Sequence, residues 1–358
     1  MSALINRAMA YAELTPVNVI TGFLGSGKTT LLQRLLTSPK MARTAVLINE
    51  FGEVGLDHLL VRPVDESMVL LQSGCICCTI RDDLNAALRD LLSKRERREI
   101  PQFDRVVIET TGLADPAPIL YPLFAEPVLR HHFRLGNVIT TVDAVNAERH
   151  VTRNPEGVKQ VAVADHLVIT KTDIAEPEAT AQARRILAQL NPSARRFDAC
   201  TDPIDADIML TSDLYDPATK SAAVQGWFQE ESRRDAEHSG QHHDHHDDSR
   251  HDQQISSFSL TLDGTLDWTV FGIWLTMLLN RHGESVLRVK GILNVTGMAA
   301  PVVINGVQHL VHPPVHLDKW PSKDRRSHIV FITRGMEQAR LRRSLAAFNR
   351  LASEAVAA

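Results

Sequence analysis

The sequence predicts an α/β domain with a mostly parallel sheet, followed by a smaller α+β domain. Two observations carry this prediction. Short runs rich in Val and Ile alternate with helical patterns over residues 15–232, and a stretch rich in His and Asp, residues 233–254, separates them from further strand and helix patterns. Alternating strands and helices are typical of a parallel sheet with right-handed crossovers.

In the first domain, near-continuous apolar runs predict strands that are covered on both faces. These are residues 16–21, 44–49, 105–109, 137–142 and 166–170, with a shorter candidate at 68–71. Between the strands, residues 83–98 place four leucines on one helical stripe. Residues 29–36 and 177–190 predict two more helices, the second stopped by Asn191-Pro192.

The second domain, residues 255–358, predicts four strands and two helices. The strands are 257–262, 285–295, 301–311 and 328–333, and the helices are 267–280 and 335–356. Residues 1–14 are expected to be a flexible tail, and 233–254 a flexible linker, because the linker has almost no apolar residue to bury.

Composition excludes several classes of protein. The 358 residues carry 39 Lys and Arg against 43 Asp and Glu, which argues against a basic nucleic-acid-binding protein. No stretch approaches the roughly 20 apolar residues of a membrane span, and no secretory signal is evident. Only four cysteines occur, three of them within four residues, so we expect metal or redox chemistry in a reducing cytoplasm.

Residues 22–29, GFLGSGKT, match the phosphate-loop pattern between a predicted strand and a predicted helix. Glycines let backbone N–H groups turn toward phosphate oxygens at the helix N-terminus. Lys28 is expected to reach the β- and γ-phosphates, and the Thr29 hydroxyl to ligate Mg²⁺. The predicted phosphate-binding residues are Gly22, Gly25, Ser26, Gly27, Lys28, Thr29 and Thr30.

Two later elements extend this nucleotide site. Glu109 ends an apolar strand and is followed three residues later by Gly112, so the acid is expected to serve Mg²⁺ and the Gly112 N–H to contact a γ-phosphate. Residues 170–173, TKTD, follow another apolar strand. The Asp173 carboxylate matches the two N–H donors of guanine, and the Lys171 stem is expected to lie across the base. Together they favour GTP over ATP.

The thiols Cys75, Cys77 and Cys78 lie on a predicted loop and can converge on one transition-metal ion. Zinc is the expected ion, with Co²⁺, Fe²⁺ or Cu⁺ left open, and a redox pair is the alternative. Cys200 stands apart and is expected to be a core thiol.

Two polar segments could add metal ligands. Residues 50–57 suit a switch loop in which Glu50 could reach a metal, while Glu53 and Asp57 are candidates to orient water. In the linker, imidazoles could collect Zn²⁺, Ni²⁺ or Co²⁺, namely those of His242, His243, His245 and His246.

Taken together, these motifs resemble the CobW-type P-loop GTPases, a family of metal chaperones. The resemblance rests on GFLGSGKTT, NEFGEVGLD, SGCICCTIRDDL, ETTGLADP, TKTD and RVKGILNV. It implies GTP hydrolysis with Lys28, Thr29 and Glu109 in the catalytic machinery, coupled to transfer of a metal, most often zinc, to a client protein. It also implies a ferredoxin-like C-terminal domain. Thr170 replaces the Asn that begins TKTD-like motifs in many GTPases.

Other functions fit parts of the pattern. The chain could be a passive zinc buffer with regulatory GTP binding, or could handle cobalt for cobalamin synthesis or for nitrile hydratase. A third alternative is a P-loop kinase that phosphorylates a small molecule. The TKTD element argues against it, because it favours guanine binding. The expected partner is a client metalloprotein, a homodimer is possible, and neither nucleic acid nor a membrane is expected.

Overall fold

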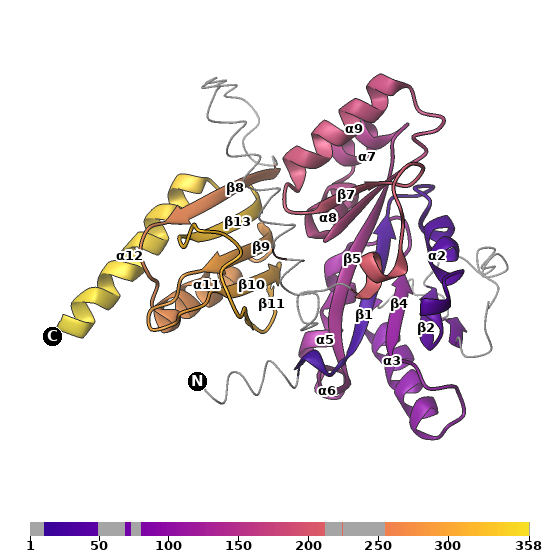
Figure 1. Ribbon diagram of the computed structural model, residues 1–358, viewed down its shortest axis with the longest axis horizontal. Helices are drawn as coiled ribbons and strands as arrows, with labels where there is room; N and C mark the ends of the chain where they lie inside the picture. Colours follow the sequence, from indigo (N-terminus) through magenta and orange to yellow (C-terminus); the bar gives the residue numbers. More distant parts are fainter. Residues whose placement is uncertain (1–10, 49–68, 73–79, 212–223, 225–254, 358) are drawn as a thin grey trace. The chain divides into compact units, whose positions relative to one another are not determined.

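The computed structural model describes residues 11–48, 69–72, 80–211, 224 and 255–357. The chain divides into two compact units, one formed mainly by Ala10–Ala188 and Ala194–Asp216, the other mainly by Pro217–Ala358 (Figure 1). The tail 1–14, except for its last four residues, and the linker 233–254 lie outside the described residues. No helix in the described ranges is long and apolar enough to cross a membrane.

The first unit is built on a seven-stranded sheet in the order β3-β2-β4-β1-β5-β6-β7. Every pairing in this sheet is parallel. The strands are β1 (Thr15–Gly22), β2 (Thr44–Ile48), β3 (Val69–Gln72), β4 (Arg105–Glu109), β5 (Phe133–Asp143), β6 (His166–Thr170) and β7 (Arg195–Asp198). The predicted parallel sheet is therefore confirmed, with one edge strand more than the sequence indicated.

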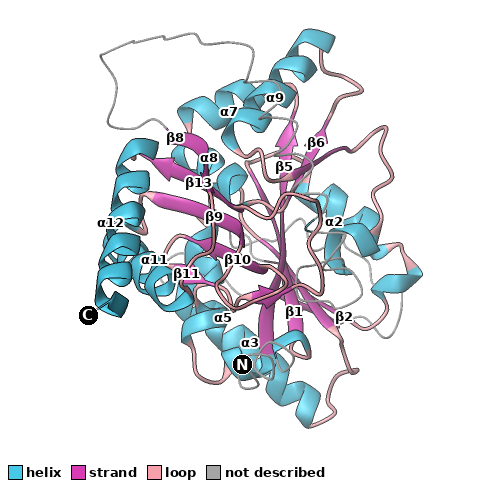
Figure 2. Cartoon of the chain, turned by 60° about the vertical axis from the view of Figure 1, so that its left-hand side comes forward, coloured by secondary structure: helices cyan, strands magenta, loops and turns pink. Residues whose placement is uncertain are grey.

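Helices cover this sheet (Figure 2). The larger ones are α2 (Lys28–Leu36), α3 (Ile80–Glu96), α8 (Pro155–Val163) and α9 (Pro177–Leu190), and the shorter ones are α4 (Pro116–Leu120), α5 (Pro122–Ala125), α6 (Leu129–His132) and α7 (Ala147–Arg153). Helix α2 buries its leucines against Ile20 and Val107. Their strand neighbours Val19 and Ile108 are also buried, as expected for a sheet covered on both faces.

The second unit is a six-stranded antiparallel sheet in the order β11-β10-β9-β13-β8, with β12 paired to β10. Its strands are β8 (Ile255–Leu262), β9 (Val286–Leu293), β10 (Val302–Val307), β11 (Leu310–Val311), β12 (Val315–His316) and β13 (Ser327–Arg334). Helices α11 (Trp268–His282) and α12 (Gln338–Ala357) share one core with it, in which Phe271 and Leu341 meet Phe331. This confirms the α+β prediction.

One predicted element of this unit is wrong. The segment 301–311, expected as a single strand, is a hairpin of β10 and β11 that pairs Val307 with Leu310. Gln308 in its turn has a φ of 50°. His309 lies in the same turn, with its Nδ1 atom 2.9 Å from the Leu279 carbonyl oxygen near the end of α11. The turn therefore fastens the hairpin to a helix end.

Candidate nucleotide-binding site

The phosphate loop lies between the end of β1 and the start of α2, as predicted. Gly25 and Gly27 have φ values of 69° and 90°, in the left-handed region that favours glycine. A Cβ on Gly22 would lie 2.4 Å from the Thr141 carbonyl oxygen. Because Gly27 occupies the N-cap of α2, the loop leads directly into the helix N-terminus, where backbone N–H groups are available to an anion.

Two neighbouring strands brace the loop through Ser26. Its hydroxyl hydrogen-bonds the Thr141 hydroxyl of β5 at 2.6 Å. Its carbonyl accepts a hydrogen bond from the Thr170 hydroxyl at 2.8 Å, at the end of β6. Thr170 therefore braces the loop with a hydroxyl, in the place where many GTPases carry an Asn. The Lys28 ammonium donates to the Phe23 carbonyl at 3.2 Å, across the same loop.

Thr29 and Glu109 meet at the mouth of the loop. The Thr29 hydroxyl donates to Glu109 Oε1 at 2.6 Å, and Glu109 is only 3% exposed. Parallel pairing explains the contact, since Glu109 is in register with Ile20 on β1. A hydroxyl and a carboxylate are hard oxygen donors of the kind that Mg²⁺ prefers, so this pair fits the predicted magnesium ligands.

Gly112 lies against the backbone of the phosphate loop. A Cβ on Gly112 would be 2.6 Å from the Leu24 nitrogen and 2.8 Å from its Cα atom. The Gly112 carbonyl accepts a hydrogen bond from Gln160 Nε2 at 3.2 Å. The close approach holds Gly112 beside the loop, where the sequence placed a γ-phosphate contact.

Lys171 is held by an acid that the sequence motifs do not predict to be part of the site. Its ammonium donates to Asp143 Oδ2 at 2.7 Å, and Asp143 is 2% exposed. Burial by itself raises the pKa of Asp143, but hydrogen bonds from Lys171, Asn146 and the Val145 N–H outweigh it, so this pKa lies below its ordinary value. Lys171 itself has a φ of 59°. The ion pair fixes the cation at the carboxyl end of β5.

Asp173 is exposed at the same edge of the sheet, beside the loop that follows β7. The Cys200 thiol lies 3.5 Å from Asp173 Oδ1 and is exposed, which corrects the expectation of a core thiol. The buried Asp198 accepts hydrogen bonds from the Thr172 hydroxyl at 2.6 Å and from the Cys200 N–H at 2.9 Å. It thereby joins the TKTD loop to the loop after β7.

The remaining predicted ligands lie outside the described residues. They are Cys75, Cys77 and Cys78, Glu50 with Glu53 and Asp57, and His242, His243, His245 and His246. Within the described ranges, no group of three or more His, Cys, Asp or Glu side chains is placed to hold a metal ion. The metal predictions therefore stay predictions.

A strand that ends in a glycine-rich loop, a helix that starts at Lys28, and an acid on the neighbouring parallel strand define a P-loop nucleotide-binding protein. Residues 16–198 match the family described as CobW/HypB/UreG, nucleotide-binding domain. Residues 255–349 match the cobalamin synthesis protein cobW C-terminal domain. The chain belongs to the CobW/HypB/UreG family and has the P-loop GTPase fold.

Several relatives resemble the chain over much of its length. The zinc chaperone YjiA of Escherichia coli is 32% identical over 333 residues, which cover 92% of this chain and 97% of YjiA. A crystal structure of Zn(II)-bound YjiA GTPase matches with a TM-score of 0.67 and 28% identity, covering 94% and 99% of the two chains. The zinc-regulated GTPase metalloprotein activator 1 of Schizosaccharomyces pombe is 34% identical, over 54% of this chain and 49% of its own.

Proposed function

We propose that this protein is a GTP-hydrolysing metallochaperone. It binds a transition metal, zinc before others, at Cys75, Cys77 and Cys78, and passes it to a client metalloprotein in a nucleotide-coupled way. The relatives named as zinc chaperones support this proposal, because YjiA matches nearly the whole of both chains. We propose that the protein transfers the metal in the cytoplasm, where thiols stay reduced.

One observation supports the proposed coupling between metal binding and nucleotide binding. Gln72 on β3 is in register with Ile48 on β2, and Ile48 is in register with Glu109 on β4. Neighbouring strands lie about 4.8 Å apart, so Gln72 is roughly 10 Å from Glu109. The thiol motif starts three residues after Gln72. Strand β3, which the thiol motif follows in the sequence, therefore ends at the side of the sheet where the carboxyl ends of the strands and the phosphate loop lie.

The nucleotide is assigned to the residues at this edge. The phosphates are bound by the phosphate loop, through Gly22, Gly25, Ser26, Gly27, Lys28, Thr29 and Thr30. Gly112 contacts the γ-phosphate. Lys171 lies across the base and Asp173 accepts from guanine. Thr29 and Glu109 would hold Mg²⁺, which when bound neutralises phosphate charge. The Lys28 ammonium would exchange the Phe23 carbonyl, a neutral acceptor, for phosphate oxygens.

We infer that GTP tightens the thiol site and that hydrolysis loosens it for the client. Loss of the γ-phosphate removes the contact at Gly112, which gives the two states that a switch needs. Coupling of this kind is reciprocal, so zinc must tighten GTP binding by the factor by which GTP tightens zinc binding.

The test is zinc affinity by chelator competition with a non-hydrolysable GTP analogue, with GDP and without nucleotide. We expect the analogue to raise zinc affinity at least tenfold, a coupling of about 1.4 kcal/mol. Cys77→Ser should abolish tight binding. The matched control is Cys200→Ser, which removes a thiol outside the motif and should leave zinc affinity unchanged without nucleotide. Zinc affinity that ignores the nucleotide would instead indicate a passive zinc buffer.

Hydrolysis is tested separately by product analysis. We expect GTP to yield GDP and inorganic phosphate with no phosphorylated acceptor, which separates a GTPase from a small-molecule kinase. Lys28→Ala should abolish turnover, because the side chain supplies charge to the transferring phosphoryl group. Normal hydrolysis by Lys28→Ala would refute the assignment of the phosphate loop.

A further inference from the structure

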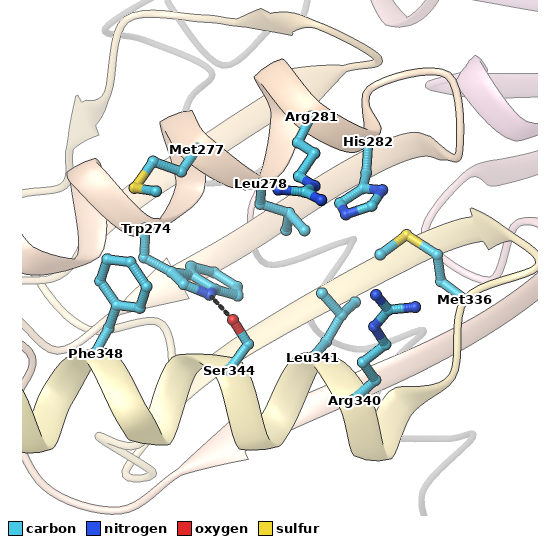
Figure 3. A pocket seen from close by; sticks show the side chains of 10 residues that line it. All are labelled: Trp274, Met277, Leu278, Arg281, His282, Met336, Arg340, Leu341, Ser344 and Phe348. Atoms are coloured by element: carbon cyan, nitrogen blue, oxygen red, sulfur yellow. Dashed lines mark hydrogen bonds between the residues drawn. The ribbon is translucent and has the colours of Figure 1, made fainter.

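The second unit contains a cavity between α11 and α12 (Figure 3). Its volume is about 210 Å³. Trp274, Leu278 and Leu341 line it and are themselves 1%, 8% and 1% exposed. The Trp274 indole N–H donates to the Ser344 hydroxyl at 3.0 Å, across the two helices. The floor is therefore apolar and held in place by packing and a hydrogen bond.

The wall at one end is apolar and adaptable. Met277 lines the cavity from α11 and is 56% exposed, and Phe348 lines it from α12. Ile273, one helical turn before Met277, is 51% exposed and continues the apolar surface along α11. Methionine side chains adapt to differently shaped apolar partners, which makes such a surface suited to protein recognition.

The other end is positively charged. Arg281 and His282 at the end of α11 face Arg340 and Met336 across the cavity (Figure 3). No acidic side chain lines the cavity among the residues that the structure describes. The two guanidinium groups make no ion pair or side-chain hydrogen bond with the described part of the chain.

The position of Arg340 is unfavourable for the helix that carries it. Arg340 lies in the first turn of α12, where the helix dipole favours anions. Arg281 lies in the last turn of α11, where a cation is favourable. The helix dipole therefore accounts for the position of Arg281 but not for that of Arg340. An external anion would pair with both guanidinium groups.

We propose that this groove binds an acidic amphipathic segment of a partner protein. One large apolar side chain enters the cavity, and carboxylates of the same segment pair with Arg281 and Arg340. Ligand pockets for whole small molecules usually measure roughly 300–1,000 Å³, so this smaller cavity suits a side-chain anchor. A second copy of this chain is disfavoured, because a two-fold contact would bring the Arg281 and Arg340 pairs together.

This inference goes beyond the proposed function, because the groove contains none of the nucleotide or thiol residues. The probes are two fluorescent, Ala-based helical peptides with the same Leu and Phe anchors, one flanked by Glu and the other by Lys. Anisotropy titrations use the full-length protein without nucleotide or added metal, so a failure here does not bear on GTP or zinc. We expect the Glu peptide to bind at least tenfold more tightly than the Lys peptide.

The matched variants are Arg340→Glu and Arg342→Glu. Both reverse an exposed charge on α12, but Arg342 does not line the cavity. Arg340→Glu should weaken binding of the Glu peptide about tenfold and strengthen binding of the Lys peptide. Arg342→Glu should change the affinity for either peptide by less than about twofold. An acid at position 340 suits the first turn of α12, so the variant should fold.

A photo-crosslinking version of the Glu peptide locates the anchor. With benzoylphenylalanine in place of Phe, we expect crosslinks at Met277 or Met336. Equal affinities for the two peptides, equal effects of the two variants, or crosslinks elsewhere would each overturn the proposal. Concentration-dependent dimers that Arg340→Glu dissolves would also overturn it, since the occupant would then be a second copy.

Discussion

The ion pair between Asp143 and Lys171 gives a sharp test of the proposed guanine-binding site. We predict that Asp143→Asn weakens the binding of GTP and the binding of GDP by the same factor. The carboxylate is 2% exposed and accepts hydrogen bonds from Lys171 Nζ at 2.7 Å, the Val145 N–H at 2.9 Å and Asn146 Nδ2 at 3.0 Å. Asn keeps one acceptor oxygen but turns an NH₂ group toward donors, so Lys171 loses its fixed position.

The size of the effect follows from these contacts. A hydrogen bond between charged groups contributes about 1.5–3 kcal/mol. The Lys171 side chain is 37% exposed, so water replaces part of the lost contact and about 1–2 kcal/mol remains. Nucleotide affinity should therefore fall about fivefold to thirtyfold.

The pKa of Asp143 fixes the pH at which this holds. It lies below the ordinary value of 3.8, so the stabilisation from the carboxylate is complete above that value and is lost as pH falls through the lowered pKa. At neutral pH the carboxylate is fully ionised.

The assay combines titration of a fluorescent GTP analogue with phosphate release under steady-state conditions. We expect KM to rise while kcat stays unchanged, because the proposed contact between Lys171 and the base would be the same in the ground state and the transition state. Asp104→Asn is the control, since it removes the same charge from an exposed pair with Arg43. In a double-mutant cycle, Lys171→Ala and Asp143→Asn should be strongly non-additive. A lower kcat with unchanged KM would refute the reasoning.

Three further predictions concern single residues. Gly112→Ala should reduce GTP affinity by tenfold or more in the same titration, because its Cβ would lie 2.6 Å from the Leu24 nitrogen. Thr170→Val should cost about 1–2 kcal/mol of GTP binding, because the Ser26 carbonyl loses its 2.8 Å donor, and Thr170→Ser should restore affinity. Gly272→Ala in α11 meets no atom within 4 Å, so thermal unfolding should show a gain of up to about 1 kcal/mol. A loss of stability in that variant would contradict the helix assignment.

The parallel sheet could be predicted from the sequence because most of its strands are buried on both faces. Runs of Val and Ile mark β1, β2, β4, β5 and β6 without ambiguity. The edge strand β7 could not be predicted in this way, because its sequence is RRFD and Arg195 and Arg196 are only half-buried. Its pairing with β6 comes from tertiary context, which overrides weak local preference.

The phosphate loop, Glu109 and TKTD could be predicted because their chemistry depends on local spacing. Asp143 could not, because its role depends on a partner 28 residues away. A signal was nevertheless present: Asp143 directly follows the predicted strand 137–142, and polar residues at the carboxyl ends of parallel strands meet at one edge. The hydroxyl brace of Thr170 depends likewise on a distant partner, the Ser26 carbonyl.

The order of the strands limits how metal and nucleotide can be coupled. In the sequence, the thiol motif follows β3 at one end of the strand order, the phosphate loop follows β1 in the centre, and the proposed base motif TKTD follows β6 toward the other end. At about 4.8 Å per strand, β3 lies roughly 10 Å from β4 but roughly 24 Å from β6. We therefore expect the proposed coupling to pass through the γ-phosphate and not through the base. It follows that Asp143→Asn, measured at saturating nucleotide, should leave the ratio of zinc affinities with GTP analogue and GDP unchanged, whereas Gly112→Ala should reduce it toward one. Loss of the ratio in Asp143→Asn would place the coupling on the base side of the sheet.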